Sequence, residues 1–111
     1  MMANLAKLTE DLRCAAHRAL ARAREVRDDG TCNLDGVFLR LPRVREAEVI
    51  AAIEAAGLGG FKWANHRWYR TGYLISPPPT GQAYKNEVAA TAMYQYLRDA
   101  GWDVSHWQQM D

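Results

Sequence analysis

The sequence predicts an α+β fold in which an N-terminal helix precedes a four-stranded, mainly antiparallel sheet and two further helices. An apolar stripe at helical spacing runs through the first segment, and stretches with period-two alternation follow it. Clusters of Gly, Pro, Asn and Asp separate these stretches from two more helical segments. The 111 residues fit one domain over 1–111, composed of an N-terminal helix in 1–30 and an α+β core in 31–111.

The first helix is predicted from apolar residues that recur at steps of three or four, and Gly30 is expected to end it. The stripe consists of Leu5, Leu8, Leu12, Ala15, Ala19, Ala23 and Val26. Such a stripe suits packing on a sheet or on a copy of itself, and alanines let a second helix approach closely. We expect the copy, and therefore at least a dimer and up to a hexamer, with ligand pockets near the subunit interface.

The remaining elements are predicted from alternation, helical spacing and the position of turn residues. Pro42 closes the first strand, glycines end the second helix, and a run of three prolines precedes the third helix. The predicted ranges are a strand at 37–41, a helix at 44–56, strands at 61–64 and 72–76 around a turn at 65–67, a helix at 84–100 and a strand at 102–107. After the first helix, the order β-α-β-β-α-β is that of the ferredoxin-like architecture.

Composition and charge favour a globular protein that stays in the cytoplasm. Hydrophobic residues make up 49% and charged residues 24% of the chain. No apolar run approaches the roughly 20 residues of a membrane span, and the N-terminus does not have the apolar core of a secretory signal. Cys14 and Cys32 cannot form a disulfide framework, so we expect reduced thiols. A net charge of +1 argues against nucleic-acid binding by bulk electrostatics.

No arrangement of residues in the sequence indicates an enzyme or a metal site. His17, His66 and His106 are scattered, and they do not have the i, i+4 spacing typical of metal ligands. The phosphoesterase pattern of a histidine followed two residues later by Ser or Thr also fails, because Trp68 and Gln108 occupy those positions. We therefore predict a protein without catalytic activity, cofactor or metal.

The loop that opens the third helix is a candidate anion-binding site. A glycine-containing loop before a helix offers unpaired backbone N–H groups and the positive end of the helix dipole. Side-chain donors and an aromatic ring accompany it, so we predict contacts to a small phosphorylated ligand from Thr80, Gln82, Tyr84, Lys85 and Asn86. The alternative is a plain helix cap after a proline-rigid entry.

Residues 62–70 interleave basic and aromatic side chains, as single-strand-binding surfaces do. Arg70, Gly72 and Tyr73 also match part of the aromatic motif of the RNA-recognition motif. The alternative is that Trp63 and one of Trp68 or Tyr69 belong to the core. The nearly neutral charge favours the structural interpretation, so a module for RNA or single-stranded DNA is the second hypothesis.

Short blocks along residues 15–111 together resemble a known family. The blocks are, in order, Gly30-Thr31-Cys32-Asn33-Leu34-Asp35, Leu41-Pro42-Arg43, Phe61-Lys62-Trp63, Tyr73-Leu74-Ile75-Ser76, Gly81-Gln82, Gly101-Trp102-Asp103 and Gln109-Met110-Asp111. In this order they resemble the first-described family of anti-Thoeris signal sponges, which are small phage-borne proteins. The resemblance implies a protein that binds cyclic ADP-ribose-type signals made by TIR enzymes without cleaving them, in the cytoplasm of the infected bacterial host.

The resemblance also implies which residues contact the ligand. The matching blocks contain Arg43 and Gln82, which the resemblance implies as ligand contacts. Ala83-Tyr84 and Ile75 replace the Gly-Asn pair and the Phe of the family, so Tyr84 or Tyr73 would have to supply the aromatic ring that stacks on the ligand. Some members also capture cyclic oligonucleotides of CBASS defence through converging arginines, which implies a second site at Arg18 and Arg98. A third hypothesis is an inhibitor that blocks a host nuclease complex by protein–protein contact.

Overall fold

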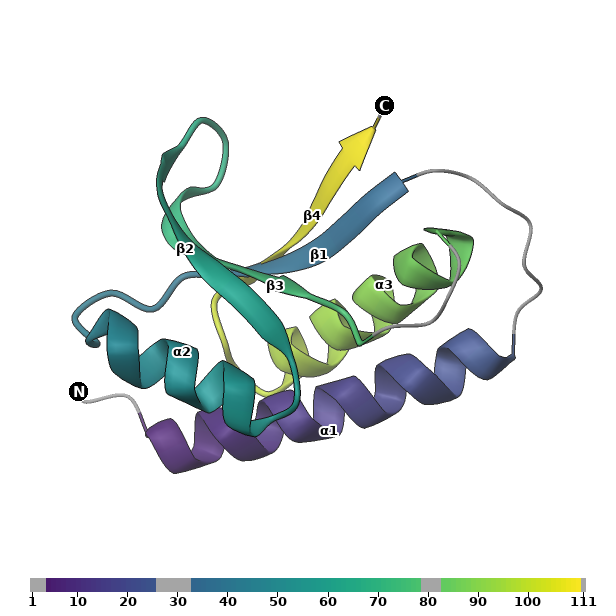
Figure 1. Ribbon diagram of the computed structural model, residues 1–111, viewed down its shortest axis with the longest axis horizontal. Coiled ribbons are helices and arrows are strands. Elements are labelled where there is room, and N and C mark those ends of the chain that lie inside the picture. The colour runs from purple at the N-terminus through teal and green to yellow at the C-terminus, as the bar shows by residue number, and fades with distance from the viewer. Residues whose placement is uncertain (1–3, 26–32, 79–82, 111) are drawn as a thin grey trace.

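The structure is an α+β fold with an N-terminal helix and a four-stranded antiparallel sheet, which confirms the predicted class (Figure 1). The computed structural model describes residues 4–25, 33–78 and 83–110. Its elements are α1 (Leu5–Arg24), β1 (Asn33–Leu39), α2 (Glu46–Ala55), β2 (Gly59–His66), β3 (Arg70–Ser76), α3 (Ala83–Asp99) and β4 (Val104–Met110). The sequence of helices and strands along the chain is the predicted one.

The strands lie in the order β2-β3-β1-β4, with β1 and β3 in the centre and every neighbouring pair antiparallel. Val37 pairs with Ile75, and Phe38 pairs with Leu74. Because side chains alternate across a strand, Val37 and Ile75 point to one face of the sheet, and Phe38 and Leu74 point to the other. The two faces have separate hydrophobic clusters.

All three helices cover one face of the sheet (Figure 1). The core between helices and sheet contains fully buried side chains from every layer: Leu8, Leu12, Val37, Leu39, Val49, Ile53, Ile75, Met93 and Leu97. Helix α1 packs along α3 and on part of α2, whereas α3 packs on β1 and β4. The opposite face of the sheet carries no helix within the described ranges, and this leaves its side chains facing outward (Figure 1).

The alanine stripe of α1 is used inside the monomer, which corrects the argument for a dimer through this helix. Ala15 and Ala19 are fully buried and Ala23 is nearly so. Their small side chains allow α1 to lie close to α3 of the same chain. The stripe is therefore not available to a second copy, and self-association stays a prediction without this support.

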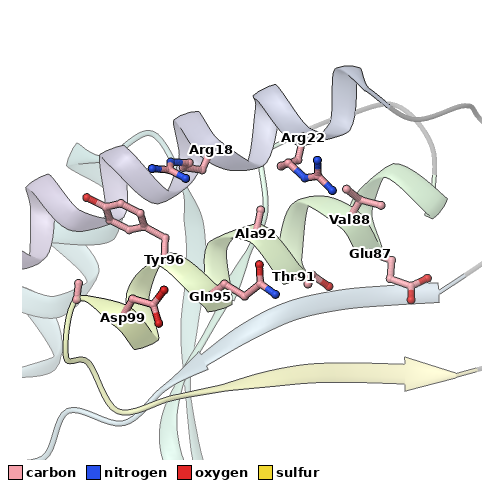
Figure 2. Close-up of a pocket in the computed structure, with 10 residues that line it drawn as sticks. Arg18, Arg22, Glu87, Val88, Thr91, Ala92, Gln95, Tyr96 and Asp99 are labelled. Carbon is pink, nitrogen blue, oxygen red and sulfur yellow. The ribbon is translucent and has the colours of Figure 1, made fainter.

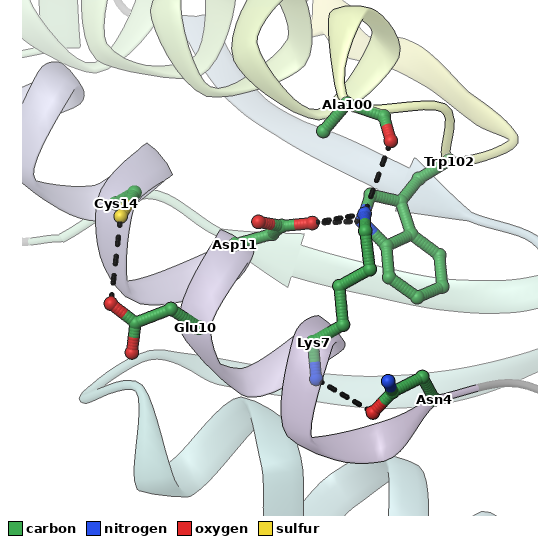
Figure 3. A network of polar contacts seen from close by, with 7 residues as sticks. All are labelled: Asn4, Lys7, Glu10, Asp11, Cys14, Ala100 and Trp102. Atoms are coloured by element: carbon green, nitrogen blue, oxygen red, sulfur yellow. Dashed lines mark hydrogen bonds and ion pairs between the residues drawn. The ribbon is translucent and has the colours of Figure 1, made fainter.

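A polar network fixes the start of α1 to the turn between α3 and β4 (Figure 3). Asn4 caps the helix by accepting a hydrogen bond from the Lys7 backbone N–H. Asp11 accepts hydrogen bonds from the Trp102 indole at 2.8 Å and from Lys7 Nζ at 2.6 Å. Lys7 Nζ also donates to the Ala100 carbonyl at 3.2 Å. Together these contacts hold α1 against the C-terminal end of α3.

Several predicted boundaries are wrong, and the error at the start of β1 has a tertiary cause. Strand β1 begins at Asn33 and ends at Leu39, although residues 31–36 read as a turn and Leu41 as strand. Strand β4 reaches Met110 and pairs with Asn33, so the partner strand overrides the turn propensity of this segment. The hairpin turn lies at 67–69, because β2 continues to His66.

The helix face of the sheet buries one carboxyl group. Asp35 is 6% exposed, and neither of its carboxylate oxygens has a hydrogen-bond partner among the described residues. Burial raises the pKa of Asp35, with His106 acting against this shift and Glu87 adding to it.

Among the helices of the described ranges, none is long and apolar enough to cross a membrane.

Candidate functional site

Aromatic side chains cover the sheet face that has no helix. We call this surface the aromatic face and define it as Phe38, Phe61, Trp63, His66, Trp68, Tyr69 and Trp107. Phe38 of β1 is fully buried at its centre, whereas Trp68 in the hairpin turn is 74% exposed. Phe61, on the edge strand β2, is 53% exposed. Exposed large aromatics beside a buried aromatic centre are typical of ligand- or partner-binding surfaces.

The hairpin between β2 and β3 folds back over the sheet to complete this face. Tyr69 stacks on Phe38 with ring centroids 5.4 Å apart, and its hydroxyl donates to the His106 carbonyl at 3.2 Å. Gly72 makes this packing possible, because a Cβ at that position would lie 2.5 Å from the Phe38 ring. Asn65 and Arg70, on either side of the turn, adopt left-handed backbone conformations, which are uncommon for residues other than glycine.

The side chain of His66 stabilises the hairpin turn by hydrogen bonds to its backbone. Its Nδ1 accepts hydrogen bonds from the backbone N–H groups of Trp68 at 3.0 Å and Tyr69 at 3.2 Å. Its ring also meets Trp63 edge to face, with centroids 4.4 Å apart. The imidazole is therefore held rigidly between the turn and the sheet.

A pocket of about 320 Å³ opens on the aromatic face. Its lining combines rings from β2, β4 and the turn: Trp63, His66, Arg67, Trp68, Tyr69, Trp107 and Gln108. The volume lies at the lower end of the range for small-molecule sites. The ring centroids of Trp63 and Trp107 lie 6.1 Å apart with their planes tilted by 52°, so these two rings pack on each other, and a planar ligand would stack on exposed ring surface beside them, such as that of Trp68.

The arginines near the pocket differ in whether other residues of the sheet already hold their side chains by hydrogen bonds. Arg40 donates to Asp103 at 2.8 Å and to Ser105 at 2.7 Å, so it serves the sheet rather than a ligand. Arg67 is exposed and lies over the Trp68 ring, with its guanidinium carbon 5.1 Å from the centroid. Arg67 is thus placed to meet an anionic group of a ligand that stacks on the neighbouring rings.

Within the described residues, the backbone of Arg43 does not lie beside the start of α3, where Tyr84, Lys85 and Asn86 are found. Thr80 and Gln82 lie outside the described residues, and Tyr84, Lys85 and Asn86 belong to the first turns of α3, where only the backbone is described. Arg43 is exposed with a left-handed φ of 67° and follows β1, near the end of α3. The 17 residues of α3 span about 25 Å, so the backbone of Tyr84, Lys85 and Asn86 lies at the other end of this helix from the strand end that Arg43 follows.

The predicted stacking role of Tyr73 does not agree with its position. Tyr73 is on β3 and pairs with Leu39, so its side chain points toward the helices. It is 3% exposed, and this burial raises the pKa of its hydroxyl, to which Glu46 adds. Tyr73 is a core residue in this chain.

A groove of about 680 Å³ between α1 and α3 contains Arg18, one of the two residues of the predicted second site (Figure 2). Arg18 lies over the Tyr96 ring, and Arg22 pairs with Glu25. Figure 2 shows the carboxylates of Glu87 and Asp99 toward the two ends of the groove. These acids offset the charges of Arg18 and Arg22, so the groove offers a phosphate no net positive charge, and we treat it as the weaker candidate for a nucleotide.

Arg98 is not part of this groove. Its guanidinium lies over the Tyr94 ring and 3.4 Å from Asp99. The two arginines of the predicted second site therefore do not converge on one pocket within a single chain. Their convergence across a symmetry axis stays a prediction.

The comparisons with known proteins identify no relative of this chain. No protein-family model, no curated protein and no solved structure matches it. The described residues also contain no cluster of three or more His, Cys, Asp or Glu side chains that could hold a metal ion.

Trp107 is the main site residue that the sequence reasoning missed. The predicted last strand ended at this tryptophan, and its period-two alternation already placed it opposite Val104 and His106. The missing step was the pairing of β4 with β1, which sets Trp107 beside Gly36 and on the same face as Phe38. The sequence contained one signal for this pairing, because a glycine in one strand leaves room for a large ring in the neighbouring strand.

Proposed function

We propose that this protein is a binding protein that holds a small nucleotide signal on its aromatic face and sequesters it without chemical change. The observation that carries this proposal is the pocket on the open sheet face, where Trp63, Tyr69 and Trp107 surround a space suited to one planar base. Trp68 and Arg67 at its edge add a stacking surface and a cation.

Stacking supplies a large part of the binding free energy that this role needs. Each base stacked on an aromatic side chain contributes about 1–3 kcal/mol. Two stacked rings and one charge-assisted hydrogen bond of about 1.5–3 kcal/mol would together contribute roughly 3.5–9 kcal/mol, which corresponds to affinities from millimolar to, at the upper end, micromolar. Sequestration rather than turnover rests on the lack of a catalytic motif in the sequence, which is itself a prediction.

The biological class of the ligand rests on the family resemblance. We propose a phage-encoded anti-defence protein that acts in the host cytoplasm on cyclic ADP-ribose-type signals or cyclic oligonucleotides. The element order and the central position of β1 and β3 support assignment of the fold to the ferredoxin-like architecture.

The proposal is tested by isothermal titration of the protein with glycocyclic ADP-ribose and with a cyclic dinucleotide. We expect heat with at least one of them, and release of the intact ligand when the protein is denatured. Trp68→Ala should weaken binding about tenfold, since it removes one stacking surface without touching the core. Arg24→Ala, an exposed change on α1, should leave binding unchanged. No heat, or recovery of cleaved ligand, contradicts the proposal.

Single-stranded nucleic acid is the second candidate, and one observation favours it. Aromatic side chains on the open face of a four-stranded sheet form the base-stacking platform of many RNA-binding modules. This candidate predicts oligonucleotide affinity that rises with length and falls steeply with salt. Sequestration of a small signal predicts the opposite, namely tight binding of a short ligand and a weak dependence on salt.

A further inference from the structure

Strand β4 forms an edge of the sheet that is suited to a second copy of the chain. The strand order places β4 at this edge, where among the described residues it pairs only with β1. We propose that β4 pairs antiparallel with β4 of a second copy, so that a two-fold axis through Trp107 joins the two sheets into one continuous sheet. This interface goes beyond the proposed function and does not depend on it.

The two edge strands of the sheet differ in how they discourage such pairing. Natural edge strands usually carry a lysine, a proline or a β-bulge, each of which prevents another strand from adding to the sheet. Strand β2 contains Lys62, and its register shifts between Trp63 and His66. Strand β4 (Val104–Met110) has seven residues, and none of them is charged, proline or glycine. The edge at β4 is therefore the one that favours association with another strand.

The hydrogen bonds between β4 and β1 show which backbone groups of β4 face the open edge. The backbone N–H of Arg40 donates to the Asp103 carbonyl at 2.9 Å, and these two residues lie opposite each other where the register of β1 and β4 continues. Hydrogen-bonded and non-hydrogen-bonded residue pairs alternate along an antiparallel ladder. The residues whose backbone N–H and C=O groups point away from β1 are therefore the even-numbered ones: Val104, His106, Gln108 and Met110.

A two-fold axis at Trp107 pairs all of these outward groups. It sets His106 opposite Gln108 of the second copy, and Val104 opposite Met110, in hydrogen-bonded pairs. The two copies of Trp107 then form a non-hydrogen-bonded pair, in which side chains lie closest and aromatic pairs stabilise a sheet. Because an axis perpendicular to the sheet keeps each face on its side, the two aromatic faces lie next to each other.

Helix α3 supplies charges for the same interface on the other face of the sheet. Tyr94 stacks on His106 with ring centroids 6.2 Å apart, so this side of α3 lies along β4. Glu87 is seven residues before Tyr94 and Arg98 is four residues after it, which places both on the same side of the helix. The charge of Glu87 also helps to raise the pKa of Asp35 on β1, in agreement with this orientation.

The two-fold axis brings these opposite charges together. Helix α3 and β4 run in opposite directions, since only the turn at 100–103 separates them. Trp107 lies about 3.3 Å beyond His106 along β4, which corresponds to about two residues of α3. The axis therefore crosses α3 near residue 92, with Glu87 about 8 Å to one side and Arg98 about 9 Å to the other. Rotation about the axis places Glu87 of one copy level with Arg98 of the second copy, so the interface is self-complementary in charge.

Sedimentation velocity of the full chain, over a series of micromolar concentrations, tests the proposal. We expect the unchanged protein to form a dimer. Gln108→Pro removes an N–H that points away from β1, and edge strands accept proline at such positions. This variant should keep its circular dichroism spectrum and weaken the dimer at least tenfold. A monomeric unchanged protein, or a folded Gln108→Pro variant that dimerises as tightly, overturns the proposal while the proposed function stands.

Glu87→Arg and Arg98→Glu test the arrangement of the two copies, and they also apply if Gln108→Pro does not fold. Each variant alone places like charges opposite each other twice in the dimer, so it should weaken the dimer about tenfold. A mixture of the two variants restores opposite charges at both places, and we expect it to form a heterodimer as tight as the unchanged dimer. Arg24→Glu, an equal change of charge at an exposed position of α1, should leave the dimer unaffected. Single variants that dimerise normally, or a mixture as weak as its components, overturn the proposal.

Discussion

Gly72→Ala tests how the aromatic face is built, because it adds one carbon atom at its most crowded point. A Cβ at Gly72 would lie 2.5 Å from the Phe38 ring and 2.6 Å from the Leu39 carbonyl oxygen. The carbonyl belongs to the paired strand β1 and cannot move aside as a flexible side chain would. Overpacking of this kind costs about 1–3 kcal/mol. Because a domain of this size class loses roughly 4–8 °C per kcal/mol, the melting temperature should fall by at least about 4 °C.

Gly59→Ala is the matched control for this change. Gly59 lies on β2, and a Cβ there meets no atom within 4 Å. Replacing such a glycine usually stabilises a protein by about 0.4–1 kcal/mol through the unfolded chain. Thermal unfolding, monitored by circular dichroism, should therefore give a lower melting temperature for Gly72→Ala and a higher one for Gly59→Ala than for the unchanged protein. If Gly72→Ala is as stable as Gly59→Ala, Phe38 does not occupy the position that defines the aromatic face.

Three further changes test the helix side of the sheet by chemical and thermal denaturation. Burial raises the pKa of Asp35 above its ordinary 3.8, so the folded state loses stability as the pH rises and this carboxyl group ionises. Asp35→Asn should therefore increase the free energy of unfolding by about 1 kcal/mol at pH 7 and leave it unchanged at pH 3. An equal gain at both pH values would contradict this. Burial acts to raise the pKa of Asp11, but hydrogen bonds from Lys7 and Trp102 outweigh it and hold the pKa below 3.8. Asp11→Asn should therefore cost about 1 kcal/mol at pH 7, with a loss that disappears in strong acid, and a loss independent of pH would count against the network. Ala19→Leu should destabilise the folded protein by about 1–3 kcal/mol, because Ala19 is fully buried and α1 packs along α3. If this variant instead changes only the oligomer size measured by light scattering, the alanine stripe contacts a second copy of the chain.

Local periodicity predicted the elements well because burial on one face leaves a clear pattern. The spacing of Leu8 and Leu12 predicted α1, and both residues are fully buried. The alternation of Val37 and Leu39 around Phe38 predicted β1 and placed these residues on opposite faces of the sheet. The boundaries were less predictable, since the length of β1 depends on how far β4 runs beside it.

The site was less predictable, because it is assembled from strands that are distant in the sequence. Local pattern could not show that Trp107 lies near Trp63, since this needs the order of all four strands. It also could not show that the strand end before Arg43 lies near the end of α3 and not near its start. The buried surface of Ala19 was assigned to a second copy because sequence spacing does not say which helix covers a stripe.

Nuclear magnetic resonance of the indole N–H groups tests most directly the proposal that the aromatic face binds a nucleotide. The chain contains four tryptophans, and Trp63, Trp68 and Trp107 lie on the aromatic face, whereas Trp102 on the helix side donates to Asp11. Titration with a cyclic nucleotide should shift the indole signals of the three residues on the face and leave that of Trp102 in place. If the signal of Trp102 shifts while the other three stay unchanged, the ligand binds on the helix side and the account of the aromatic face is wrong.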